Sequence, residues 1–160
     1  MSTAAKRQHG AVHQMNVRVG YHETDGQQRV HHANYLNYFE QSRVELLRAA
    51  GFDYRQFEAS GLMLVVTEMH VRYRGAAVFD DLQRVTTTVV EVRGVRIRHH
   101  YRIDREGEIL VEADSTIACV YKENQSFLAS EGLIIPVAVG AEAALTDDLM
   151  RAEARIRSTA

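Results

Sequence analysis

The hydrophobic and polar positions divide the chain into one strand, one long helix and then a run of strands. Apolar residues alternate with polar ones over residues 15–21, which predicts a half-buried strand. Residues 23–29 are polar and include a glycine, so we expect a loop there. Residues 34–50 contain neither proline nor glycine and stop at Gly51, which predicts a helix with a glycine suited to its C-terminal cap. Apolar residues lie on more than one face of this helix, so we expect it to be buried.

After a short helical turn at residues 54–59, alternation of period two returns and predicts an antiparallel sheet. The expected strands cover residues 65–74, 82–93, 95–104 and 111–121, with tight turns at residues 93–94 and 104–107. In the first of them we expect one face to hold Val65, Thr67, Met69, Val71 and Tyr73. A sheet with one apolar face must be covered, and the helix at 34–50 is the long apolar segment that can cover it. The predicted fold class is α+β, an antiparallel sheet wrapped around one long central helix.

The rest of the chain predicts flanking segments around a single domain. We expect a disordered arm at residues 1–13, the domain at residues 14–135, and a tail at residues 136–160. A further short strand is expected within residues 127–139 and a short helix from about Thr146.

Composition narrows the classes of function. The net charge of −2, from 19 basic and 21 acidic residues, gives no general attraction to nucleic acid or to an anionic membrane. The single cysteine, Cys119, cannot form an intrachain disulfide, and its apolar strand predicts a small buried side chain rather than a nucleophile. We expect no membrane span, and we expect the protein to be cytoplasmic, because it has no apolar run of sufficient length and no disulfide framework.

The loop before the long helix holds the candidate chemistry. Asp25 lies there, and the start of a helix offers unpaired backbone N–H groups at the positive end of a dipole. Hydrolysis of a thioester builds negative charge on the carbonyl oxygen, which such donors stabilise, while a carboxylate can activate water or attack the carbon. From the residues alone, a carboxylate that only caps a turn is the favoured alternative.

This stretch resembles the signature of the 4-hydroxybenzoyl-CoA thioesterase branch of the hotdog superfamily, and is most similar to its acyl-CoA thioesterases. The matching positions are Tyr21, Thr24, Asp25, His32, Asn34, Tyr35, Phe39, Glu40 and Arg43. Weaker matches follow at residues 72–76 with Asp80–Asp81, and at residues 118–120. The resemblance covers residues 17–121 and implies a hotdog fold and a thioester hydrolase without a metal or another cofactor.

The resemblance also implies roles for individual residues. Asp25 matches the catalytic carboxylate, as general base or nucleophile, and His32 matches the position whose backbone N–H polarises the carbonyl. The motif positions expected around the substrate are Tyr21, Thr24, Ala33, Asn34 and Tyr35; of these Asn34 and Tyr35, like Glu40, match positions of mainly structural role. An active site between two subunits is implied, in a homodimer that often pairs into a homotetramer.

The sequence departs from the family in the loop itself. Gln27 and Gln28 stand where glycine is usual, Arg29 replaces a small apolar residue, and Ala76 replaces a proline. Because glycine permits tight turns and close approach to a ligand, these changes leave the substrate open.

Other polar groups have two interpretations each. Arg72, Arg74, Arg96 and Arg98 could dock the phosphates of CoA, although an ordinary solvated face of the sheet is favoured. The pairs His31–His32 and His99–His100 lack the spacing of metal ligands, so no metal site is expected. Glu40 and Arg43, three apart on the helix, are expected to form an ion pair.

The sequence therefore predicts an acyl-CoA thioesterase that releases a carboxylic acid and free CoA. Two alternatives remain open: the same reaction on an acyl carrier protein, and a non-catalytic acyl-binding module.

Overall fold

The computed structural model describes residues 10–123. In chain order the elements are β1 (Val12–Arg18), the 3-10 turn η1 (Tyr21–Glu23), α1 (Asn34–Ala49), α2 (Tyr54–Ala59), β2 (Leu62–Tyr73), β3 (Leu82–Arg93), β4 (Arg96–Arg105) and β5 (Glu108–Tyr121). This is the predicted order of strand, long helix and strands. β1 begins inside the segment predicted as a disordered arm, while the predictions for residues 127–139 and for the tail lie outside the described residues.

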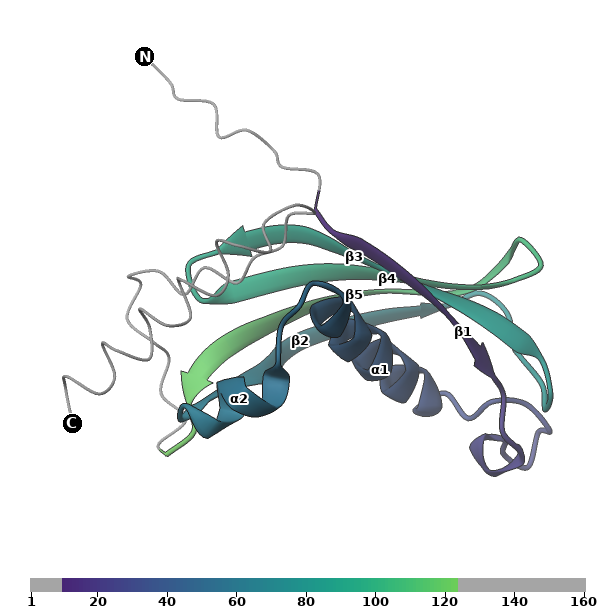
Figure 1. Ribbon diagram of the computed structural model, residues 1–160. Coiled ribbons are helices and arrows are strands. Elements are labelled where there is room, and N and C mark those ends of the chain that lie inside the picture. Colours follow the sequence, from purple (N-terminus) through teal and green to yellow (C-terminus); the bar gives the residue numbers. More distant parts are fainter. Residues whose placement is uncertain (1–9, 124–160) are drawn as a thin grey trace, which may run out of the picture.

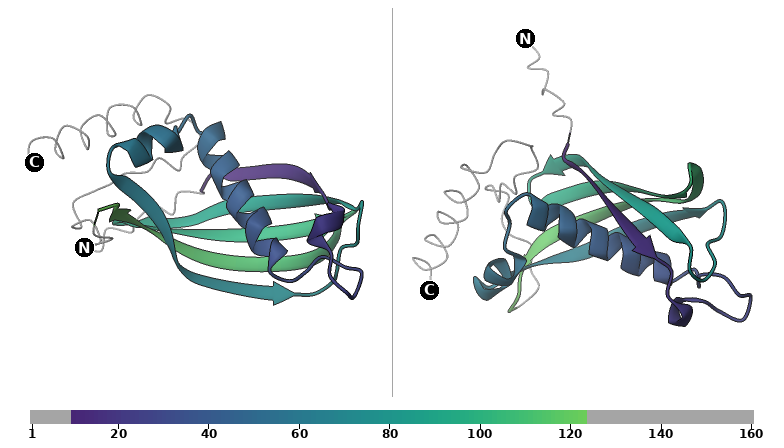
Figure 2. Two further views of the ribbon diagram at one scale, coloured as in Figure 1. Left: turned by 90° about the horizontal axis from the view of Figure 1, so that it is seen from below. Right: turned by 45° about the vertical axis from the view of Figure 1, so that its right-hand side comes forward.

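The strands form one sheet in the order β1-β3-β4-β5-β2, and every neighbouring pair is antiparallel. The sheet curves, and α1 lies across its concave face (Figure 1). Two further views show α2 following α1 toward the beginning of β2, at one edge of the sheet (Figure 2). The predicted fold class, α+β with the sheet wrapped around one long helix, is confirmed.

The turns between the last three strands are as short as predicted. Gly94, between β3 and β4, has φ 58°, and Glu106 and Gly107, between β4 and β5, have φ 49° and 85°. Left-handed backbone of this kind matches the twist of hairpin strands, which explains the glycines at both turns.

Two details of the predicted strands are wrong. β1 ends at Arg18, so Tyr21 does not continue it but lies in η1 with 77% of its surface exposed. In β2 an irregularity between Val66 and Glu68 shifts the register against β5. Val66 therefore points toward α1 together with Met69, whereas Val65 points to the outer face, because a bulge reverses the alternation.

The core consists of two hydrophobic clusters under the two halves of α1. One cluster contains Leu46, Leu47, Phe52 and Phe57, and the other contains Tyr35, Tyr38 and Phe39. Leu46, Leu47 and Phe39 each expose 5% of their surface or less, so the helix is buried as its composition predicts.

Polar contacts join α1 to the sheet between these clusters. Ser42 hydrogen-bonds to Thr87, and the Nη1 atom of Arg43 donates to the Tyr101 hydroxyl at 3.0 Å. That hydroxyl is also 2.8 Å from the Ser115 hydroxyl. Arg43 thus points into the sheet, and among residues 10–123 no Glu40–Arg43 ion pair forms, contrary to the prediction.

Candidate active site

The loop between β1 and α1 is a tight hairpin with Asp25 near its tip. Thr24 and Val30 form an isolated antiparallel bridge. One step further in, the Asp25 N–H donates to the Arg29 carbonyl at 2.9 Å, and the Asp25 carbonyl accepts the Gln28 N–H at 2.9 Å. The hairpin is fixed to the body of the protein at Val30, whose N–H donates to the Ala77 carbonyl at 2.9 Å. Asp25 therefore has a defined position despite lying in a polar loop.

The Asp25 side chain is half-buried and has one oxygen engaged. Its Oδ1 atom accepts the backbone N–H of Gln27 at 2.8 Å. This is the turn-capping contact that the residues alone favour. No group of residues 10–123 donates to Oδ2, so the carboxylate keeps one oxygen for a further partner.

The chain returns from the hairpin directly into the first turn of α1. The Ala33 N–H donates to Nδ1 of His31 at 3.1 Å, and the Asn34 N–H donates to the His31 carbonyl at 2.9 Å. Within residues 10–123 the backbone N–H of His32 has no acceptor. The position predicted to polarise a carbonyl thus offers an unused donor at the positive end of a helix of 16 residues.

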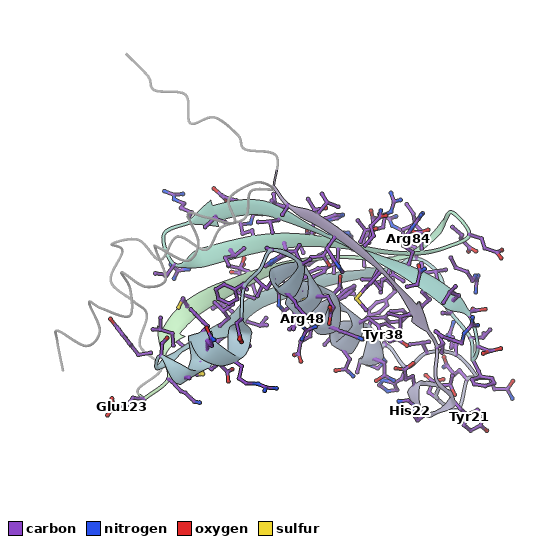
Figure 3. All side chains as sticks on the ribbon, in the orientation of Figure 1. Tyr21, His22, Tyr38, Arg48, Arg84 and Glu123 are labelled. Carbon is purple, nitrogen blue, oxygen red and sulfur yellow. The ribbon has the colours of Figure 1, made fainter. Side chains whose placement is uncertain are left out.

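Aromatic side chains surround this helix start. The His32 ring stacks on that of His31, with centroids 4.2 Å apart, and meets the edge of the Tyr73 ring at 6.4 Å. The Tyr73 hydroxyl donates to the His32 carbonyl at 2.9 Å. Tyr21 lies outside this group and packs edge-on against Phe79; Figure 3 shows it with His22 at the end of the molecule beyond β1.

Two of the predicted substrate-binding residues hold the loop in place. The Asn34 amide donates to the Glu23 carbonyl at 2.8 Å. The Tyr35 side chain is buried, and its hydroxyl accepts the Ala77 N–H at 3.3 Å. Burial is the main cause that raises the Tyr35 pKa, so the hydroxyl stays neutral. These contacts agree with a structural role for both residues.

The sequence analysis missed Glu23. Its Oε2 atom accepts the Gly20 N–H and the Tyr38 hydroxyl, each at 2.7 Å, and its carbonyl accepts the His31 N–H at 2.9 Å. A glutamate in a polar loop carries no pattern that reveals such contacts, because Tyr38 is 15 residues away.

The four arginines predicted to dock phosphate lie on the other face of the sheet. Arg96 and Arg98 alternate with side chains buried against α1, so they point away from it. Arg72 pairs with Asp114 and Arg74 with Glu112, both at 2.8 Å, and Arg98 pairs with Glu91 at 3.4 Å. The structure therefore places the hairpin with Asp25 beside the start of α1, leaves Tyr21 outside this group, and places these arginines on the other face of the sheet.

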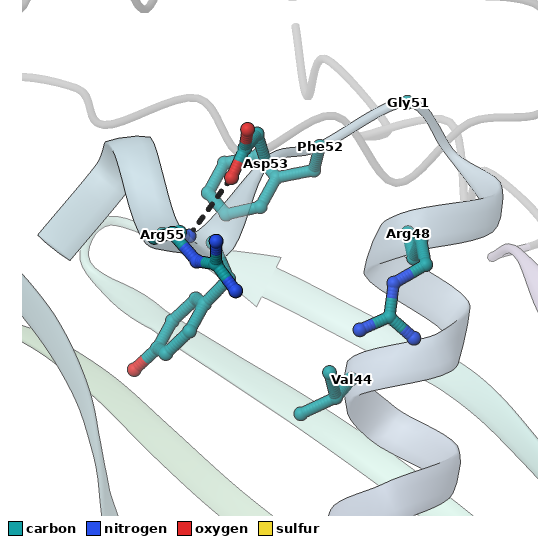
Figure 4. A pocket seen from close by; sticks show the side chains of 7 residues that line it. Val44, Arg48, Gly51, Phe52, Asp53 and Arg55 are labelled. Carbon is teal, nitrogen blue, oxygen red and sulfur yellow. Dashed lines mark hydrogen bonds between the residues drawn. The ribbon is translucent and has the colours of Figure 1, made fainter.

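A cavity of about 410 Å³ lies at the opposite end of α1. It is lined by Val44, Arg48, Gly51, Phe52, Asp53, Tyr54 and Arg55 (Figure 4). Asp25 is not part of this cavity.

No cluster of three potential metal ligands occurs within residues 10–123, and no helix in that part of the chain is long and apolar enough to cross a membrane.

The structure shows how Gln27, Gln28 and Arg29, where the loop departs from the family, are arranged. Gln28 has φ 62°, so the backbone keeps the left-handed conformation that a glycine would favour. The Gln27 amide oxygen accepts both Nε and Nη2 of Arg29, at 2.9 and 2.7 Å. The exposed tip is therefore filled by an amide–guanidinium contact where glycines would leave space.

Comparison with known proteins identifies the family. The family model described as "Thioesterase-like superfamily" matches residues 11–152. The acyl-CoA thioesterase YbgC of Haemophilus influenzae is 40% identical over 105 residues, which are 65% of this chain and 77% of that protein. The long-chain acyl-CoA thioesterase FadM of Escherichia coli is 30% identical over 121 residues, 74% of this chain and 89% of that protein.

Solved structures agree with this result. A probable thioesterase from Bartonella henselae has 32% identity and a TM-score of 0.68, over 74% of this chain and 100% of that one. A DHNA-CoA thioesterase from Staphylococcus aureus has a TM-score of 0.74 over 93% of this chain and 95% of that one; at 20% identity it supports the fold alone. The predicted hotdog fold and the predicted class of enzyme, a thioester hydrolase, are confirmed, and the chain belongs to the thioesterase-like superfamily.

Proposed function

We propose that the protein hydrolyses acyl-CoA thioesters, with Asp25 as the catalytic carboxylate and the start of α1 as the carbonyl site. One observation carries the proposal: among residues 10–123, Asp25 has an oxygen without a donor, in a fixed hairpin that leads directly to the His32 N–H, which has no acceptor. The names of the related proteins supply the substrate class.

The reaction needs a base or nucleophile and a donor for the oxyanion. In the general-base form, water adds to the thioester carbon while Asp25 accepts its proton, and the His32 N–H stabilises the charged oxygen. The carbon–sulfur bond then breaks, the CoA thiolate takes up a proton, and a carboxylic acid remains. In the nucleophilic form, an Asp25 oxygen attacks the carbon, the carbon–sulfur bond breaks and the CoA thiolate leaves and takes up a proton, and water then hydrolyses the resulting anhydride to free Asp25 and the carboxylic acid.

The proposal includes a homodimer with the active site between subunits, and pairing of two dimers stays a prediction. The outer edge of β2 supports it, because within residues 10–123 this strand of 12 residues pairs on one side only, with β5. Val66 and Tyr73 of this strand are each 49% exposed. A long edge strand with exposed apolar residues favours pairing with a second chain.

The substrate contacts are also part of the proposal. We propose Tyr21, Thr24, Ala33, Asn34 and Tyr35 as these contacts. Thr24 lies on the loop and Ala33, Asn34 and Tyr35 lie at the start of α1, whereas Tyr21 lies in η1 against Phe79. Docking of the CoA phosphates by Arg72, Arg74, Arg96 and Arg98 stays a prediction, and a phosphate at Arg72 or Arg74 would have to replace a carboxylate partner.

The test is a thiol-release assay on short, long and aromatic acyl-CoAs with the wild type and Asp25→Asn. Asparagine still accepts the Gln27 N–H but carries no charge, so the loop is kept and the base is lost. We expect kcat to fall at least about 100-fold. Asp53→Asn is the matched control, because Asp53 also caps backbone N–H groups, those of Arg55 and Gln56, at the far end of α1.

Full activity of Asp25→Asn would refute the role of this carboxylate. Faster release of the same acyl group from an acyl carrier protein would move the substrate to that carrier. Tight binding of acyl-CoA without release of thiol would support the non-catalytic alternative.

A further inference from the structure

We infer that Glu23 is a positioning residue that holds Asp25 at a fixed place relative to the start of α1. The inferred effect of Glu23 on the reaction rests on the proposed function. The inferred effect of Glu23 on the loop rests on geometry alone. Glu23 accepts four hydrogen bonds, and their donors come from three separate parts of the site.

The side chain of Glu23 joins the end of β1 to the second turn of α1. One carboxylate oxygen, Oε2, accepts both the Gly20 N–H and the Tyr38 hydroxyl at 2.7 Å. Tyr38 exposes only 2% of its surface. Burial and the neighbouring Glu23 raise the Tyr38 pKa, so the hydroxyl stays protonated and donates.

The backbone carbonyl of Glu23 links this residue to the segment that leads from the hairpin into α1. Its carbonyl accepts the His31 N–H at 2.9 Å and the Asn34 side-chain amide at 2.8 Å. Glu23 precedes Asp25 by two residues, and His31 precedes His32 by one. The contacts of Glu23 therefore fix both ends of the hairpin that carries Asp25, next to the donor proposed for the carbonyl.

This arrangement predicts a defined consequence for catalysis. Without the Glu23 side chain the hairpin can shift against α1, and displacements of about 1 Å at a reacting group can cost about 100-fold in rate. Bound substrate does not touch Glu23 in the proposed site, so the loss should appear in kcat more than in KM.

The experiment compares Glu23→Ala, Glu23→Gln and Tyr38→Phe with the wild type. We expect Glu23→Ala to lose at least tenfold in kcat with less than threefold change in KM. Glutamine keeps an oxygen for Gly20 and Tyr38, so Glu23→Gln should recover most of the rate, and Tyr38→Phe should fall between the two. Glu91→Gln, an exposed carboxylate on β3, is the control.

Hydrogen exchange of the His31 amide gives a second readout that needs no activity. Its acceptor is the backbone carbonyl of Glu23, which every variant retains. We expect at least tenfold faster exchange in Glu23→Ala at this amide, with unchanged exchange at core amides of β4 and β5. A merely structural role would change all of these amides together and would overturn the inference.

The two proposals fail in different ways. Unchanged kcat and unchanged His31 exchange in Glu23→Ala, with an inactive Asp25→Asn, would overturn the role of Glu23 and leave the enzyme assignment standing. Absence of thiol release by the wild type would overturn the proposed function, and the exchange measurement would still decide whether Glu23 holds the loop.

Discussion

A buried histidine makes the stability of the fold depend on pH in a way that can be calculated. His99 on β4 is 2% exposed, its ring packs against that of Tyr101, and among residues 10–123 its Nδ1 atom has no hydrogen-bond partner. Burial, and secondarily the nearby Arg43 guanidinium, lower the His99 pKa from 6.5 to about 3. The folded protein therefore holds this ring neutral at every pH above about 3.

The direction of the pH dependence follows from proton binding in the folded and the unfolded states. Between pH 6.5 and 3 the unfolded chain binds a proton at His99 and the folded chain does not, so unfolding is favoured as the pH falls. The contribution of neutral His99 to the unfolding free energy is therefore complete above pH 6.5 and is lost progressively as the pH falls below that value. With these two pKa values, the loss from pH 8 to pH 5 is about 2 kcal/mol.

Urea denaturation at pH 8 and pH 5, followed by circular dichroism, tests this value. Carboxylates and other histidines titrate as well, so the informative quantity is the difference between the wild type and His99→Leu at equal protein concentration. We expect the unfolding free energy of the wild type to fall by about 2 kcal/mol more than that of His99→Leu. His22→Leu, which changes an exposed ring, should behave as the wild type. Equal losses in wild type and His99→Leu would refute the reasoning.

Two further predictions concern the loop and the core. Gln28→Gly should raise the unfolding free energy by about 0.5–1 kcal/mol, because a left-handed conformation at φ 62° is strained for glutamine and not for glycine. Gln27→Gly is the control in the same urea titration and should be destabilising, and a loss of stability in Gln28→Gly would contradict the prediction. Burial raises the pKa of Cys119 to about 12, so iodoacetamide at pH 8 should label this thiol only in urea. Rapid labelling of the native protein, measured by mass spectrometry, would show that the thiol is accessible.

The hydrophobic periodicity predicted helices and strands correctly where the local pattern agrees with the contacts that the segment makes in the fold. The long helix ends as expected because Gly51 takes φ 81° and its N–H donates to the Arg48 carbonyl. β3 was predicted to the residue, since its run of Val and Thr residues favours a strand and a glycine turn follows it directly. In β2 the pattern failed because Val65 and Val66 are both apolar, so the sequence does not reveal on which side of the bulge the alternation reverses.

Some side-chain partners could not be predicted, because they lie on segments that are distant in the sequence. Spacing on the helix predicted an ion pair of Arg43 with Glu40, but Arg43 lies on the side of α1 that faces the sheet and donates to Tyr101 instead. The arginines of β4 were correctly placed on a polar face, yet their separation from the start of α1 depends on which face of the sheet α1 covers. Resemblance to a family indicated the candidate site, whereas the contacts of Glu23 join residues that are distant in the sequence.

The two interpretations of Asp25 are compatible, because they use different oxygens of one carboxylate. Oδ1 fixes the turn through the Gln27 N–H, which restrains the side chain to one orientation. A restrained carboxylate loses less conformational freedom when a reaction begins than a mobile one, so capping favours catalysis by the second oxygen. Asp53 caps α2, a helix of six residues, through one oxygen in the same way, but it lies at the far end of α1 from the motif residues. What separates a structural carboxylate from a proposed catalytic one in this chain is therefore its position beside the start of the long helix α1, and the difference between Asp25→Asn and Asp53→Asn measures that directly.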